Sequence, residues 1–133
     1  MIGIVLITHG SIGKSMLDVA SQLIKIDTQY IEIVSCPLFD QIDLLKEVKQ
    51  VFCRMLQVKS FLVLTDLFGS TPTNITQLLT DKHKFSVITG LNMPMLLKAL
   101  TYYKDNHMTL DVLASKVYDA ARSCIVLEEK LGL

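Results

Sequence analysis

The sequence has no excess of charge of either sign. Its 133 residues include 13 Lys plus Arg and 13 Asp plus Glu, so the formal net charge at pH 7 is zero. Proteins that bind nucleic acid or an anionic membrane surface through a general electrostatic field carry a positive excess. We therefore expect neither nucleic acid nor a membrane surface among the partners.

Cysteine is scarce as well. The chain has three cysteines, which lie far apart and form no CxxC pair: Cys36, Cys53 and Cys124. An odd number of isolated cysteines argues against a disulfide framework and against a structural zinc site. We expect core thiols in a reducing cytosol, and neither a metal nor another cofactor.

Long apolar runs are absent too. The apolar stretch at residues 2–7 has no basic leader, and it is too short for a signal sequence or a membrane-spanning helix. We interpret it as a buried strand and predict a cytoplasmic protein with no direct membrane insertion. A chain of this length fits one domain, which we place at residues 1–133.

Short apolar runs alternate with helical patterns along the chain. Near-continuous apolarity is typical of parallel strands covered on both faces, and it occurs at 2–8, 30–34, 61–65 and 85–89. Helical spacing predicts the other elements at 16–24, 40–55, from Thr71 onward, from 92–94 onward, and at 110–122. Residues 124–127 fit a short strand as well as a helix. The alternation predicts an α/β fold, a doubly wound, mainly parallel four-stranded sheet with helices on both faces.

Polar residues follow three of the predicted strands. In an open parallel sheet, ligands bind beyond the carboxyl ends of the strands, where loops and helix N-termini converge. His9 and Gly10 follow the first strand, Asp66 follows the third, and Asn92 comes shortly after the fourth. We expect all of them at one edge of the sheet.

His9 and Asp66 are the candidate reactive pair. A carboxylate that accepts a hydrogen bond from one ring nitrogen fixes the tautomer, stabilises a positively charged ring and leaves the other nitrogen free as a nucleophile. Such a ring could accept a phosphoryl group. The segment 69–71 opens the third predicted helix, and a helix N-terminus offers N–H groups and partial positive charge to an anion.

Other interpretations of these residues stay open. A histidine at a strand end is often only a polar residue in a turn. A His-Asp pair also serves hydroxyl nucleophiles in hydrolases, for which Ser70 and Thr71 are the candidates. The chain has neither GxSxG nor GxxxxGK[ST], the central motifs of α/β-hydrolases and P-loop kinases. We interpret His83 and His107 as solvated loop residues and Met93 as core filling or groove lining.

Three motifs together resemble one family. They are the strand that runs into THG at 8–10, TDLFGSTPTN at 65–74 and GLNMPML at 90–96. In this order and spacing they resemble the IIA components of the mannose-type family of the bacterial sugar phosphotransferase system, and the resemblance covers the whole chain. It implies that the phosphocarrier protein HPr phosphorylates His9, and that a histidine of a IIB component then accepts the phosphoryl group.

The resemblance also implies roles for the residues around the pair. Asp66 matches the aspartate that orients the histidine, and Thr71 stands where the family usually has a serine near the phosphoryl group. The phosphoryl-binding residues would be Gly10, Gly69, Ser70 and Thr71. The partner-facing residues would be Phe68, Asn74, Asn92 and Met93. The family's homodimer implies an additional C-terminal antiparallel strand, exchanged between subunits, near residues 124–130.

Two departures from the family's pattern bear on these roles. The loop commonly has two glycines before the serine, whereas Ser70 takes the second position here, which strains or reshapes the turn if φ must be positive. The chain also ends at Leu133 without a linker or a IIB domain, so we expect IIB as a separate chain. The phosphoryl-donor subunit of bacterial dihydroxyacetone kinase, which has a similar histidine, stays an alternative, as does a regulatory module that moves no sugar.

Overall fold

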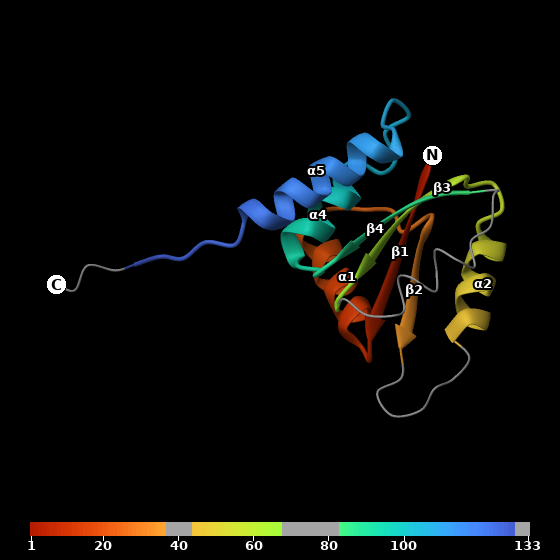
Figure 1. The fold of residues 1–133 in the computed structure, drawn as a ribbon, viewed down its shortest axis with the longest axis horizontal. Coiled ribbons are helices and arrows are strands. Elements are labelled where there is room, and N and C mark those ends of the chain that lie inside the picture. The colour runs from red at the N-terminus through yellow and green to blue at the C-terminus, as the bar shows by residue number, and fades with distance from the viewer. Residues whose placement is uncertain (37–43, 68–82, 130–133) are drawn as a thin grey trace.

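The computed structural model describes residues 1–36, 44–67 and 83–129. At its centre is a four-stranded sheet of order β2-β1-β3-β4 (Figure 1), formed by β1 (Ile2–His9), β2 (Ile31–Cys36), β3 (Ser60–Thr65) and β4 (Lys84–Thr89). All of these strand pairings are parallel. The predicted strands are therefore confirmed, each within two residues at either end.

The described helices are α1 (Ile12–Leu23), α2 (Leu44–Arg54), α4 (Met93–Tyr102) and α5 (Leu110–Ser123). Helices α4 and α5 begin where the spacing predicts, whereas α1 begins before the predicted segment 16–24. A local contact with the preceding strand fixes the first turn of α1, because the buried Thr8 hydroxyl accepts the N–H of Gly13. The predicted start of α2 at residue 40 and the helix predicted from Thr71 lie outside the described residues.

Both faces of the sheet are covered by helices. Ile4 and Leu6 of β1 belong to a core cluster with α1, α4 and α5, while Val5 and Ile7 belong to a second cluster with α2. Because alternate residues of β1 meet two apolar layers, nearly the whole strand is buried. Figure 1 shows α2 on the side of the sheet opposite α1, α4 and α5, so the predicted architecture is confirmed.

The chain leaves α5 as an extended tail. Residues 124–129 form neither helix nor strand, and Figure 1 shows them running away from the domain. Three consecutive apolar side chains of this tail are exposed, Ile125 at 79%, Val126 at 69% and Leu127 at 86%. The exchanged strand stays a prediction, and the tail carries the apolar surface that such a strand would bury.

The prediction of core thiols is wrong for two of the three cysteines. Cys36 is buried at the end of β2, but Cys53 on α2 and Cys124 after α5 are exposed. Cys53 faces outward because Val48 and Phe52 supply the buried side of α2. Within the described ranges, no helix is long and apolar enough to cross a membrane.

Candidate active site

β1 and β3 are neighbours in the sheet, although α1, β2 and α2 separate them in the sequence. In their register Ile7 lies opposite Thr65, so both strands end at the same edge. His9 and Asp66, 57 positions apart in the chain, therefore meet beyond the carboxyl ends of β1 and β3. The sequence predicts them at this edge.

Asp66 holds His9 by the ring and by the backbone at once. The Nδ1 atom of His9 lies 3.1 Å from both Oδ1 and Oδ2 of Asp66, and the backbone N–H of His9 donates to Oδ2 at 2.9 Å. An ionised carboxylate only accepts hydrogen bonds, so the proton in the ring contact belongs to Nδ1. The lone pair of the neutral ring is then on Nε2.

The carboxyl group of Asp66 has a pKa below its ordinary value of 3.8. Burial raises the pKa, but the hydrogen bonds from the backbone N–H and ring of His9 and from the N–H of Leu67 outweigh that effect. The Leu67 N–H donates to Oδ1 at 2.9 Å. Asp66 is therefore a well-stabilised anion at neutral pH.

The His9 side chain is accessible, whereas Asp66 is largely covered. The exposed fraction of the side chain is 43% for His9 and 12% for Asp66. No residue in the described ranges forms a hydrogen bond with Nε2 of His9. The nitrogen that carries the lone pair is thus on the side of the ring away from Asp66, without a hydrogen-bond partner among these residues.

The turn after His9 depends on a glycine. Gly10 has a φ of +52°, a conformation that costs energy for residues with a side chain. Its N–H donates to the carbonyl oxygen of Cys36 at 3.0 Å, which joins the turn to the end of β2. Gly10 therefore lets the backbone bend directly from His9 toward α1. Its predicted part in phosphoryl binding stays a prediction.

Reasoning from the sequence places two threonines at the strand ends beside the pair, but it gives them no role. Thr8, which precedes His9, is 0% exposed, and Thr65, which precedes Asp66, is 2% exposed. Both hydroxyl groups form hydrogen bonds, with the N–H of Gly13 and with the hydroxyl of Thr89. The sequence shows a hydroxyl residue at the end of each apolar run. This pattern does not identify a buried hydrogen bond, because a polar residue also begins an ordinary loop.

Asn92 lies at the same edge, but its side chain already has partners within the chain. Its Oδ1 accepts the N–H of Met95 in the first turn of α4 at 2.9 Å, and its Nδ2 donates to the carbonyl oxygen of Ala121 on α5 at 3.0 Å. Met93 is half-buried and packs against the core cluster of α1, α4 and α5. Asn92 thus joins α4 to α5, and the partner-facing role of both residues stays a prediction.

The remaining predicted site residues lie outside the described residues. These are Phe68, Gly69, Ser70, Thr71 and Asn74, which include both candidate hydroxyl nucleophiles. In the part of the chain that the structure describes, no group of three or more His, Cys, Asp or Glu side chains is placed to hold a metal ion. The described site consists of His9, Asp66 and the backbone that fixes them.

The other two histidines have different surroundings. His107 is exposed in the turn before α5, as predicted. His83 is half-buried because its ring lies against Phe61 and Phe85, with ring centroids 5.5 and 6.0 Å away. The prediction of a solvated loop residue is therefore wrong for His83. The polar sequence DKHK gives no sign of the contact between His83 and Phe61, which arises when β3 pairs with β4.

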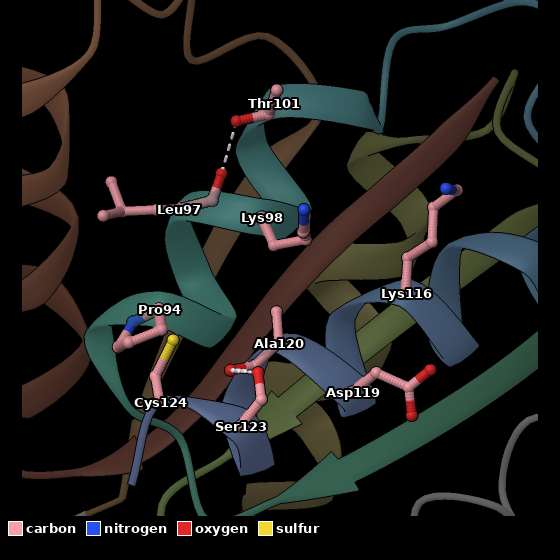
Figure 2. A pocket seen from close by; sticks show the side chains of 9 residues that line it. All are labelled: Pro94, Leu97, Lys98, Thr101, Lys116, Asp119, Ala120, Ser123 and Cys124. Carbon is pink, nitrogen blue, oxygen red and sulfur yellow. Dashed lines mark hydrogen bonds between the residues drawn. The ribbon is translucent and has the colours of Figure 1, made fainter. Parts of the chain in front are cut away.

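A groove of about 630 Å³ lies between α4 and α5, as Figure 2 shows. Its lining residues are Pro94, Leu97, Lys98, Thr101, Lys116, Asp119, Ala120, Ser123 and Cys124. Two of its hydroxyl groups donate to carbonyl oxygens of their own helix, Thr101 to Leu97 and Ser123 to Ala120. None of the predicted site residues lines the groove, so it is a feature separate from the His9–Asp66 pair.

Comparison with known proteins points to one family. Residues 3–117 match the family model described as "PTS system fructose IIA component". The mannose-specific EIIAB component of the phosphotransferase system of Escherichia coli (strain K12) is 27% identical over 122 residues, which is 91% of this chain. The chain spans 38% of the length of that relative.

Solved structures give the same result. The phosphotransferase system component EIIA from Streptococcus agalactiae has a TM-score of 0.77 and 28% identity, with 95% of this chain and 96% of that chain covered. The mannose/sorbose specific IIA subunit from Enterococcus faecalis has a TM-score of 0.74, with 98% and 97% covered. At 22% identity the latter supports the fold alone.

Proposed function

The chain belongs to the fructose/mannose-type IIA family of the phosphotransferase system, and from this we propose that it carries a phosphoryl group on His9. In this proposal phospho-HPr is the donor, and a histidine of a IIB component is the acceptor. Gly10, Gly69, Ser70 and Thr71 contact the phosphoryl group, while Phe68, Asn74, Asn92 and Met93 face the partner proteins. The carrier works in the cytoplasm.

The double contact of Asp66 with His9 is the observation that carries the proposal. The carboxylate bonds both Nδ1 and the backbone N–H of His9, so the ring is held before any partner arrives. The lone pair on Nε2 lies on the side of the ring away from Asp66, and 43% of the His9 side chain is exposed. A nucleophile that exchanges groups with other proteins needs this combination of fixed orientation and access.

The transfer needs no cofactor in this mechanism. The Nε2 lone pair attacks the phosphorus atom of the donor's phosphohistidine, and a new N–P bond forms as the donor's N–P bond breaks. The electron pair of the broken bond returns to the donor ring. Since the proton stays on Nδ1, the phosphorylated ring of His9 is positively charged, and the Asp66 carboxylate stabilises it.

The direction of transfer depends on which partner is bound. Donor and acceptor are both histidines, so the bond that breaks and the bond that forms have the same chemistry. The protein therefore contributes positioning and charge stabilisation rather than a large driving force. Helix α1 begins three residues after His9, and the positive end of its dipole lies at the same edge of the sheet.

The test is phosphorylation with purified enzyme I, HPr and phosphoenolpyruvate, followed by mass spectrometry that locates the phosphate. We expect an acid-labile phosphate on His9 that a separate IIB protein then removes. Phosphate on Ser70 or Thr71 would contradict the proposal and favour the hydrolase or another hydroxyl chemistry. Phosphate that stays on His9 in the presence of IIB would contradict the carrier role and favour a regulatory module.

We also propose a homodimer in which the C-terminal tails are exchanged. The exposed side chains of Ile125, Val126 and Leu127 support it, because three consecutive apolar residues gain stability when another surface covers them. Removal of residues 125–133 should shift the molecular mass measured by light scattering from dimer to monomer. A truncated chain that stays dimeric would contradict the exchange.

A further inference from the structure

The threonines that precede the two residues of the pair have an unusual position. Among the described residues, Thr8 and Thr65 are the only buried side chains with a hydroxyl group apart from Tyr103, whose hydroxyl donates to the carbonyl oxygens of Asp27 and Gln29. A hydroxyl group in an apolar core lowers stability unless it is hydrogen-bonded, and valine has nearly the same shape without that cost. A hydroxyl at each of these positions therefore points to a specific hydrogen bond as the reason for the residue.

Thr8 joins the strand before His9 to the helix after it. Its Oγ1 accepts the N–H of Gly13 at 2.8 Å, in the first turn of α1. A Cβ atom at Gly13 would lie 2.6 Å from this oxygen, so the contact is close enough to require glycine. With the Gly10 N–H bonded to Cys36, the backbone is fixed on both sides of His9.

Thr65 joins the residue before Asp66 to the end of β4. Its hydroxyl donates to Oγ1 of Thr89 at 3.0 Å. Its carbonyl oxygen accepts the N–H groups of both Gly90 and Leu91 at 2.9 Å. The end of β3, and with it the position of the Asp66 carboxylate, is therefore tied to the neighbouring strand by side chain and backbone.

We propose that Thr8 and Thr65 are positioning residues for the His9–Asp66 pair. Each fixes the end of its strand, so that the ring and the carboxylate are at hydrogen-bonding distance before a partner binds. Loss of either hydroxyl should slow phosphorylation of His9, and this effect rests on the proposed function. Loss of either hydroxyl should also weaken the hydrogen bond between Nδ1 of His9 and Asp66, and this effect does not rest on it. The two consequences can therefore be tested separately.

The first test measures the tautomer of the His9 ring in Thr8→Val and Thr65→Val by ¹⁵N NMR at a pH where the ring is neutral. We expect the wild-type ring to be protonated at Nδ1 and the valine variants to lose part of this preference. Thr8→Ser and Thr65→Ser, which keep the hydroxyl, should restore it. Thr101→Val is the matched control, because the Thr101 hydroxyl donates to the carbonyl oxygen of Leu97 in its own helix.

The second test measures the rate at which phospho-HPr phosphorylates the same variants. We expect the valine variants to react roughly ten- to a hundredfold more slowly, because small misplacements of a reacting group cost that much. The serine variants and Thr101→Val should stay within about twofold of the wild type, which is small beside the loss from a misplaced group. A slower rate with an unchanged tautomer would overturn the positioning role.

A further variant addresses the case in which Thr65→Val does not fold, because it removes both hydroxyls of the bond between Thr65 and Thr89. The double substitution Thr65→Val with Thr89→Val exchanges two bonded hydroxyls for apolar groups of the same shape, a change that is often neutral for stability. A folded double variant with the wild-type tautomer would overturn the role of Thr65. If HPr does not label the wild type, the proposed function fails, while the NMR result still decides this inference.

Discussion

His9 and His83 lie at opposite ends of the same sheet, and the sheet gives them different surroundings. His9 ends β1 and bonds to a carboxylate, while His83 precedes β4 and packs against two phenylalanine rings. At the carboxyl ends, the backbone turns of three strands bring polar residues together. At the amino end near His83, an aromatic cluster closes the core. The end of the sheet, rather than the residue type, determines which histidine has a carboxylate beside its ring.

The largest expected effect distinguishes the two histidines when each is replaced in turn. His9→Gln should abolish acid-labile labelling by HPr, because glutamine has no nucleophilic ring nitrogen. His83→Gln should keep the wild-type rate, because its ring packs against Phe61 and Phe85 at the end of the sheet opposite His9. Quantitative mass spectrometry of the phosphorylated protein measures both. If His9→Gln is still phosphorylated, His9 is not the phosphorylated residue. If His83→Gln is folded but is not phosphorylated, His83 is required for the reaction as well.

The aromatic end should govern stability. Phe61 is fully buried, and its ring centroid lies 4.6 Å from that of Phe52 and 5.5 Å from that of Phe85. Phe61→Ala should lower the free energy of unfolding by about 3–5 kcal/mol, measured by urea denaturation. The fraction that stays folded should still be phosphorylated at the wild-type rate. A smaller loss of stability would show that the cluster collapses around the cavity.

The carboxyl-end pair should govern rate more than stability. Asp66→Asn keeps the shape of the side chain but removes the charge that stabilises the phosphorylated ring. We expect the transfer from HPr to slow roughly 10²-fold, measured by quenched-flow kinetics. Asp119→Asn on the exposed face of α5 is the matched control. Equal rates for the two variants would remove Asp66 from the mechanism.

The smallest expected effect is on the free energy of unfolding at acidic pH, to which the Asp66 carboxylate contributes. Because the folded pKa of Asp66 lies below 3.8, its hydrogen bonds stabilise the fold above that pH, and the stabilisation is lost as the pH falls through the folded pKa. The difference in unfolding free energy between the wild type and Asp66→Asn should therefore shrink on acidification. Urea titrations below pH 5 measure it. A difference that is constant over this range would contradict the lowered pKa.

Much of the fold and the centre of the site could be predicted from the sequence. The near-continuous apolar runs identified the strands because both faces of the sheet are covered. The rule that ligands bind beyond the carboxyl ends of parallel strands selected His9 and Asp66, and their hydrogen bonds are present in the structure. The family resemblance added roles that the residues alone left open.

Two of the differences have a common physical cause. The contact of His83 with Phe61 requires the pairing of β3 with β4, and the bond from Thr8 to the first turn of α1 requires the turn at Gly10. Neither contact is visible in local periodicity. Cys53 was misplaced because that prediction followed the residue type, whereas the 3.6-residue turn of an α-helix puts Cys53 off the face that Val48 and Phe52 bury.

The carboxylate of Asp66 reaches both the ring and the main chain of His9, and for the proposed carrier this arrangement affects how quickly partners can exchange a phosphoryl group. A side chain that is ordered in advance loses little freedom when a partner arrives. Encounters between carrier proteins can then be brief, since no rearrangement has to precede the reaction. Such a site suits a relay in which each protein binds weakly, reacts and leaves, and in which turnover depends on dissociation as much as on bond making.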